Sequence, residues 1–198
     1  MKQRPLIIAL GLLTVARLLL NTGHRLVSPF LPVIARGLGI PLESAGVLVA
    51  ARSAAAMATP AIVTAGRRYD RRALVYLGLA MFCVGSGIAA IVGVYAGVLV
   101  GFVLMGLGKA VFDVSGQAYL SDRVPYESRA RWLAAFETTW AGGFLIGAPI
   151  VGWLISLSGW ETAYGVIAVL VGVSLLAALA LLDEDHAEMA ERGRLTLD

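Results

Sequence analysis

The sequence predicts an all-α membrane protein with six transmembrane helices, arranged as two inverted repeats of three. Hydrophobic residues make up 59% of the chain and the mean hydropathy is +0.82, whereas soluble domains are roughly 45–50% apolar. Six apolar windows are each long enough to cross a bilayer, which takes about 20 residues. A short motif also recurs between the two halves of the chain.

The six windows define a transmembrane domain at residues 1–182. We expect the spans at 6–34, 43–65, 73–94, 95–120, 130–157 and 162–182. Residues 183–198 are polar and acidic, which is typical of a solvated tail or a short surface helix.

The basic residues outside the spans predict the orientation of the chain. They gather at the N-terminus and in the second and fourth connections, whereas the first, third and fifth connections offer only Arg36. By the positive-inside rule, both termini are then cytoplasmic, in a multi-pass protein of the cytoplasmic (inner) membrane. The basic residues concerned are Lys2, Arg4, Arg67, Arg68, Arg71, Arg72, Arg123, Arg129 and Arg131. Because they lie in short loops between spans, we expect them to set topology and not to bind nucleic acid.

The internal repeat has an offset of 84 residues. The segment 41–44 (Pro-Leu-Glu-Ser) precedes the second span, and 125–128 (Pro-Tyr-Glu-Ser) precedes the fifth. In the same register Arg25 corresponds to Lys109. Three spans, an odd number, separate the copies, so the two triplets insert in opposite orientations, as in several secondary transporters.

Charged residues divide the spans into two kinds. The third and sixth spans carry no charge, which predicts that they form a lipid-facing scaffold. The other four carry charges that are costly in hydrocarbon unless they face a partner or a water-filled cavity. We expect the following side chains to line a pathway for substrate and protons: Arg17, Asn21, His24, Arg25, Arg52, Lys109, Asp113, Gln117 and Glu137.

Within this set, spacing predicts local pairs. The polar residues of the first span recur every three or four positions and so share one helix face. Lys109 and Asp113 stand at i and i+4, close enough for a salt bridge. The pair also has a purely structural explanation, in which each charge neutralises the other so that the helix can insert into the membrane. Arg17 and Arg25 have a structural explanation too, since long side chains can extend towards the headgroups.

Four cations face only two carboxylates in these spans, and this imbalance favours an anionic or amphiphilic ligand. A carboxylate in such a setting can exchange protons near neutral pH. Glu137 has no cation within a turn of its own helix, so it is the better proton site, with Asp113 the alternative. We expect Arg52 to be able to reach Glu137 across helices.

The fifth span contains small residues four positions apart, which permit close contact between helices. The residues concerned are Gly143, Gly147 and Gly152, with Pro149 loosening the backbone between them. They can pack either against a second subunit or inside one subunit.

The sequence gives little reason to expect that the protein is an enzyme. Ser115-Gly116 resembles the serine segment of intramembrane proteases, but the only histidines are His24 in the first span and His186 in the tail. No cluster has the spacing of metal ligands, so we expect neither a metal nor a cofactor. Cys83 is the single cysteine, which excludes an intrachain disulfide.

The chain resembles the N-terminal half of a major facilitator superfamily transporter over nearly its full length. The arginine-rich connection before residues 73–78 is similar to the family's loop G-x-L-A-D-R-x-G-R-R, and Gly159-Trp160-Glu161 resembles the usual Gly-Trp-Arg. The run from Gly143 to Gly152 is similar to a motif of drug/proton antiporters. The resemblance implies that the first and fourth helices line a cavity, the second and fifth meet the other half, and the third and sixth face lipid.

The resemblance also implies a cytoplasmic gate built on the second connection, at Arg67, Asp70, Arg71 and Arg72. In this alignment Val63 replaces the first glycine and Arg67 replaces the gate aspartate, so the usual latch is altered. Lys109 is the nearest substitute for the family's fourth-helix arginine.

Six helices form one wall of a cavity, and a second wall must cover its polar face. The leading hypothesis is a half-size secondary transporter working as a parallel homodimer, a proton-coupled exporter of small amphiphilic or anionic compounds. The alternatives are a non-transporting, carrier-derived subunit or assembly factor of a larger complex, and one half of a heterodimeric transporter.

Overall fold

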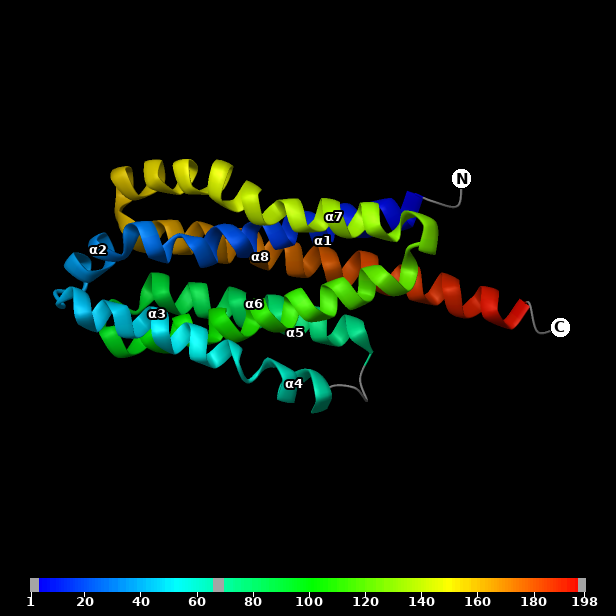
Figure 1. Ribbon diagram of the computed structural model, residues 1–198, viewed down its shortest axis with the longest axis horizontal. Helices are drawn as coiled ribbons and strands as arrows, with labels where there is room; N and C mark the ends of the chain where they lie inside the picture. Colours follow the sequence, from blue (N-terminus) through cyan, green and yellow to red (C-terminus); the bar gives the residue numbers. More distant parts are fainter. Residues whose placement is uncertain (1–3, 66–69, 196–198) are drawn as a thin grey trace.

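The computed structural model describes residues 4–65 and 70–195, and over these residues it consists of helices (Figure 1). In chain order they are α1 (Arg4–Arg25), α2 (Val27–Gly37), α3 (Leu42–Ala56), α4 (Thr59–Ala65), α5 (Arg71–Ile91), α6 (Tyr95–Arg123), α7 (Tyr126–Gly142), the π-helix η2 (Gly143–Gly147) and α8 (Ala148–Leu195). The all-α fold expected from the hydropathy is confirmed. The helix α8 extends beyond the predicted sixth span into the polar tail.

Five helical segments are long and apolar enough to cross a membrane, and the last of them is long enough to cross it twice. That segment, Tyr126–Leu182, has 57 residues and would be about 86 Å long if straight, far more than the ~30 Å of a bilayer core. Gly159 interrupts it with φ +86° and ψ 168°, a conformation that suits glycine. The chain reverses there, and Figure 1 shows α7 and the rest of α8 running in opposite directions.

The start of α1 and the end of α8 lie at the same end of the bundle (Figure 1). The equivalent helices α1 and α6 run in opposite directions, as an inverted repeat requires. The repeated motif has one structure in both copies. Pro41 and Pro125 are the N-cap residues of α3 and α7, and their carbonyls accept hydrogen bonds from the N–H groups of Ser44 and Ser128, both at 3.1 Å.

Prolines lie in or near several other irregular points of the helices. Pro32 lies inside α2, and Pro60 follows the break between α3 and α4. The π-helix η2 ends two residues before Pro149. Proline has no N–H to donate and its ring crowds the carbonyl four residues earlier, so the wider turn of η2 relieves this conflict.

The helix α5 packs against both α6 and α8. A Cβ added to Gly78 of α5 would lie 2.7 Å from the backbone nitrogen of Phe112 in α6, so these two helices are in close contact. On the other side of α5, the Cys83 thiol lies 3.3 Å from the Ala168 carbonyl of α8. Apolar side chains of α8 such as Val169 and Leu176 point outwards, 66% and 68% exposed, which suits a helix that faces lipid.

Candidate functional site

Arg17 of α1 is the centre of an ion-pair cluster inside the membrane domain. Its side chain is only 6% exposed, and its guanidinium contacts both carboxylates of the predicted pathway. Nε donates to Oδ1 of Asp113 in α6 at 3.1 Å, and Nη1 donates to Oε1 of Glu137 in α7 at 2.7 Å. Nη1 also donates to the Phe136 carbonyl at 2.9 Å, and the guanidinium carbon lies 4.2 Å from the centre of the Phe136 ring. Arg17 therefore joins three helices.

Two residues of α6 complete the cluster. Lys109 forms the expected ion pair with Asp113, through the carboxylate oxygen that Arg17 does not use. Gln117 donates from Nε2 to Oε1 of Glu137 at 2.7 Å. The cluster thus holds two cations and two carboxylates, and its formal charge is zero.

The sequence allowed Arg52 to reach Glu137, but in the structure Arg17 binds that carboxylate. Arg17 and Glu137 are 120 positions apart in the chain, so no spacing along one helix could reveal their contact. Arg52 of α3 instead lies inside the bundle, where it donates a hydrogen bond from Nη1 to the carbonyl of His24.

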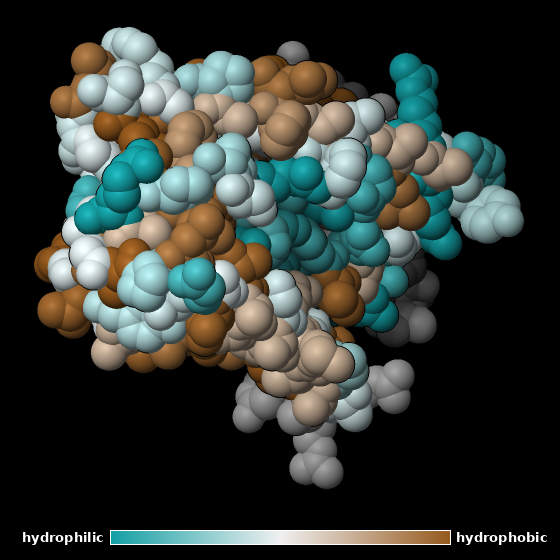
Figure 2. Space-filling view, turned by 60° about the vertical axis from the view of Figure 1, so that its left-hand side comes forward, coloured by the Kyte–Doolittle hydropathy of each residue, from teal (hydrophilic) through white to brown (hydrophobic). Residues whose placement is uncertain are grey.

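The cluster opens towards one face of the molecule. Exposure increases from Arg17 (6%) to Asp113 (24%) and Glu137 (51%), so the carboxylates reach from the packed interior to the surface. Figure 2 shows hydrophilic residues gathered in a hollow that apolar surface borders. At membrane depth, such a face needs water, a ligand or more protein against it.

The stripe predicted on the first span continues from Arg17 along α1. Asn21 donates from Nδ2 to Oγ1 of Thr139 at 3.2 Å. One turn further, the Arg25 guanidinium lies 3.8 Å above the centre of the Trp140 ring, a cation–π contact. The sequence interpretation omitted Trp140, although it lies three positions after Glu137 and hence on nearly the same helix face.

The glycines of the fifth span pack inside this chain. A Cβ on Gly143 would lie 2.9 Å from Cβ of Asn21, and one on Gly147 would overlap the hydroxyl of Thr22. Gly152 faces Phe30 of α2. Gly143 and Gly147 are both buried against α1, so neither lies on a surface that a second copy could contact, whereas Pro149 is exposed.

The gate residues that the structure describes connect helix ends. Asp70 caps α5 by accepting from the Arg72 N–H at 3.2 Å, and it also binds the Arg72 guanidinium at 2.7 Å. Arg72 reaches the Leu182 carbonyl of α8 at 3.3 Å, and Arg71 pairs with Asp122 of α6 at 2.9 Å. Arg67 lies outside the described residues.

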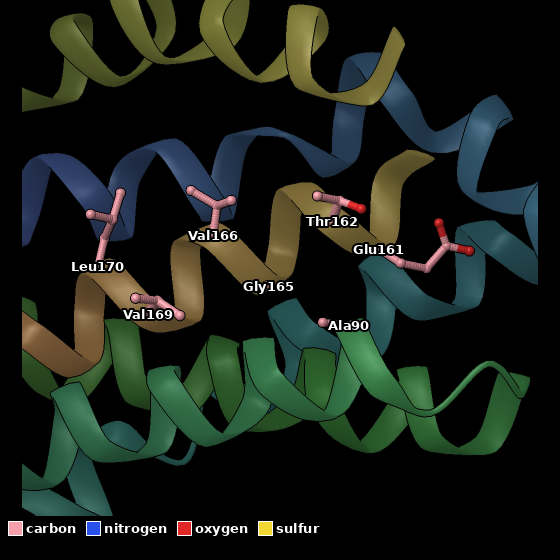
Figure 3. Close-up of a pocket in the computed structure, with 7 residues that line it drawn as sticks. All are labelled: Ala90, Glu161, Thr162, Gly165, Val166, Val169 and Leu170. Carbon is pink, nitrogen blue, oxygen red and sulfur yellow. The ribbon is translucent and has the colours of Figure 1, made fainter. Parts of the chain in front are cut away.

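A second hollow lies apart from the charged cluster. It measures about 480 Å³ and lies between the end of α5 and α8, among Ala90, Val166 and Leu170 (Figure 3). Glu161 and Thr162 are at one end of it. Its lining is mainly apolar, and Val166 and Leu170 are also exposed, so this hollow belongs to the lipid-facing side. Among residues 7–64 and 70–182, whose side chains the structure describes, no group of three or more His, Cys, Asp or Glu side chains could hold a metal ion.

The sequence is also similar to those of a known protein family. Residues 13–196 match the sequence profile of the Major Facilitator Superfamily. The chain belongs to the major facilitator superfamily. This confirms the resemblance inferred from the sequence motifs. Members of the superfamily are membrane transporters and typically not enzymes, and the chain is a multi-pass membrane protein.

Curated relatives are similar over most of this chain. The uncharacterised MFS-type transporter YbcL of Bacillus subtilis is 26% identical over 160 residues, which are 80% of this chain and 41% of YbcL. The inner membrane transport protein YdhP of Escherichia coli K12 is 28% identical over 149 residues, 74% of this chain and 38% of YdhP. The chain thus spans about two fifths of the length of these relatives.

Solved structures share the fold. The POT family transporter PepTSo superposes with a TM-score of 0.77 at 18% identity, over 91% of this chain and 37% of that protein. The nucleoside transporter NupG (D323A mutant) superposes with a TM-score of 0.70 at 14% identity, over 87% of this chain and 48% of NupG. At these identities the likeness establishes the fold alone.

Proposed function

We propose that this chain is one half of a proton-coupled secondary transporter, and that a second, parallel copy supplies the opposite wall of the substrate cavity. The substrates are small amphiphilic or anionic compounds. The observation that carries the proposal is the contact of one nearly buried cation, Arg17, with both Asp113 and Glu137 on a face that opens outwards.

This geometry supplies a way to couple protons to a ligand. A proton on Glu137 removes one of the two negative charges that hold Arg17. The guanidinium then has a donor and a positive charge available for an anionic group of a substrate. Conversely, a bound anion favours the protonated carboxyl, so proton and substrate influence each other reciprocally.

Glu137 is better placed than Asp113 to exchange the proton. Its side chain is 51% exposed, whereas that of Asp113 is 24% exposed and lies between Arg17 and Lys109. Protonation of Asp113 breaks two ion pairs, and protonation of Glu137 breaks one. Asp113 therefore serves to position Arg17 and Lys109.

A second copy would solve the problem of the open face. A half-exposed carboxylate at membrane depth is costly against lipid. Because the two halves of a full-length family member are related by an axis along the membrane normal, two copies with the same orientation can reproduce that arrangement. The outer side of α7 and the segment after it, with Trp140, Leu145 and Trp153 exposed, offers apolar area for this contact.

Transport in proteoliposomes with a pH-sensitive dye inside tests the proposal. A pH gradient is imposed, a panel of small organic acids and amphiphiles is added, and dissipation of the gradient is recorded. Glu137→Gln should abolish substrate-dependent proton flux at unchanged expression. The matched control is Glu127→Gln, which neutralises an exposed carboxylate in the first turn of the same helix and should leave the flux intact.

Unchanged flux in Glu137→Gln would eliminate Glu137 as the coupling site. Absence of flux in the wild-type chain with every compound, together with stable association with unrelated membrane proteins, would favour the role of a carrier-derived subunit.

A further inference from the structure

Arg52 is a buried cation that the Arg17 cluster does not use. It is only 5% exposed, in the second half of α3, and its backbone packs directly on Gly106 of α6. An enclosed guanidinium of this kind cannot extend to the headgroups. Its charge needs a counter-charge inside the protein, because an isolated ion in a low dielectric costs several kcal/mol.

No carboxylate among the described residues supplies that counter-charge. Asp113 and Glu137, the carboxylates of the neighbouring helices, are bound to Arg17 and Lys109. Arg52 donates from Nη1 to a neutral acceptor, the His24 carbonyl, while its Nε is buried without a hydrogen-bond partner. A buried donor without a partner loses its hydrogen bonds to water and forms none in the protein, which destabilises the folded state.

Two more buried polar atoms in the same region have no hydrogen-bond partner. They are the hydroxyl of Tyr164 in α8, a residue only 2% exposed, and Nδ1 of His24 in α1. Arg52 contacts the backbone of His24 and packs on Gly106 of α6. Tyr164 lies against Phe102, which is one turn before Gly106 on the same helix. The Tyr164 ring is fixed by contacts with Phe102 and Trp160, at centroid distances of 5.6 and 6.1 Å.

We propose that Arg52, Tyr164 and His24 bind a small monovalent anion inside the six-helix bundle. The guanidinium Nε–H and the tyrosine O–H are donors to it, and His24 donates in the tautomer that carries hydrogen on Nδ1. Because Arg52 and Tyr164 are nearly buried, we expect the ligand to be small: a halide, nitrate or a single carboxylate group. The site is distinct from the Arg17 cluster, and its existence does not depend on transport.

Thermal unfolding of the purified full chain in detergent tests this site. Sodium chloride, bromide or nitrate replaces sodium gluconate at constant ionic strength, so that only the identity of the anion changes. We expect Tm to rise along a saturating curve, because a ligand that binds only the folded state stabilises it. Arg52→Gln should abolish this dependence, and Arg36→Gln, which removes an exposed cation of α2, should leave it unchanged.

Tyr164→Phe keeps the ring and removes only the hydroxyl, so it tests the site if Arg52→Gln does not fold. We expect it to weaken the apparent affinity for bromide about 10-fold, the effect of losing one hydrogen bond to a charged group. The same thermal unfolding assay is repeated with acetate and with benzoate in place of the inorganic anions. Stabilisation by these carboxylates without an effect of halides would identify the anion as the head group of an organic acid, and both results support the site.

The proposal fails if no anion gives a saturable shift in Tm, or if Arg36→Gln removes the shift as completely as Arg52→Gln does. Buried water would then satisfy the three polar atoms. Because these measurements need no transport, their failure is distinguishable from failure of the proton-coupling proposal.

Discussion

At the scale of single residues, Arg17 determines how α1, α6 and α7 meet. Its guanidinium makes two ion pairs and one backbone hydrogen bond while remaining nearly buried. Ion pairs that are removed from water contribute to stability only when their geometry is good and the remaining polar atoms are satisfied. Gln117 and Lys109 meet that condition for the two carboxylates, so the cluster behaves as one unit.

Arg17→Gln should lower the free energy of unfolding by about 3 kcal/mol, the low end for breaking a buried ion pair, because Glu137 is half exposed. Thermal or denaturant unfolding in detergent measures this loss. In the double variant Arg17→Gln, Glu137→Gln the loss should be smaller than the sum of the single effects by about 1–3 kcal/mol. Additive effects would show that the contact contributes nothing to stability.

Spacing in the sequence predicted only some of the contacts in the Arg17 cluster. Lys109 and Asp113 are four positions apart on one helix, so their pairing followed from spacing alone. The contacts of Arg17 depend on how three helices pack, and this information is absent from the spacing within any one of them. Glu137 consequently seemed to lack a cation, and Trp140 was overlooked.

At the scale of helices, the contact between α1 and the fifth span depends on glycine. Gly143 and Gly147 bring the π-helix η2 close to Asn21 and Thr22, which fixes the distance over which Arg17 reaches α7. The small-residue pattern predicted a close helix contact but left open whether the partner was this chain or a second one. Burial of both glycines places the contact within the chain.

Gly147→Ala should therefore destabilise the protein by about 1–3 kcal/mol, the usual cost of overpacking, because its Cβ would overlap the Thr22 side chain. The matched control is Gly87→Ala in α5, where a Cβ meets nothing within 4 Å. Since alanine is the better helix former, that control should be neutral or stabilising by up to about 1 kcal/mol. Equal effects of the two substitutions in thermal unfolding would refute the close contact.

The all-helical membrane fold was predictable because hydropathy directly reflects the bilayer, whereas the division of the expected spans into separate helices, as at Leu26 and Met57, was not. The motif at 41–44 and 125–128 also indicated the repeat correctly, since both copies begin a helix with the same proline cap. The π-helix η2 and the position of the turn at Gly159 were not predicted. They depend on local backbone conformation at proline and glycine, and hydropathy carries no information about it.

At the scale of the whole molecule, the two chain ends and the arginines of α5 and α6 lie at one end of the bundle (Figure 1). We expect this end to be cytoplasmic by the positive-inside rule. Single cysteines introduced at Val94 and Tyr126, which are 60% and 81% exposed, test the orientation in a Cys83→Ala background. An impermeant maleimide added to intact cells should label Val94→Cys and not Tyr126→Cys, and the reverse pattern would invert the topology.

The open charged face makes assembly the central question for the whole molecule. One chain provides the wall that holds Arg17, Asp113 and Glu137, and a transport cavity needs a second wall. The chain spans about two fifths of the length of relatives such as YbcL, and the proposed function assigns the second wall to another copy of the chain.

Native mass spectrometry of the complex, released gently from its own membrane, tests this account most directly. We predict a mass of two identical chains, twice 20.8 kDa, that persists at low detergent concentration. A single copy, alone or bound to unrelated proteins, would contradict the homodimer and would make the charged face a contact surface for another subunit.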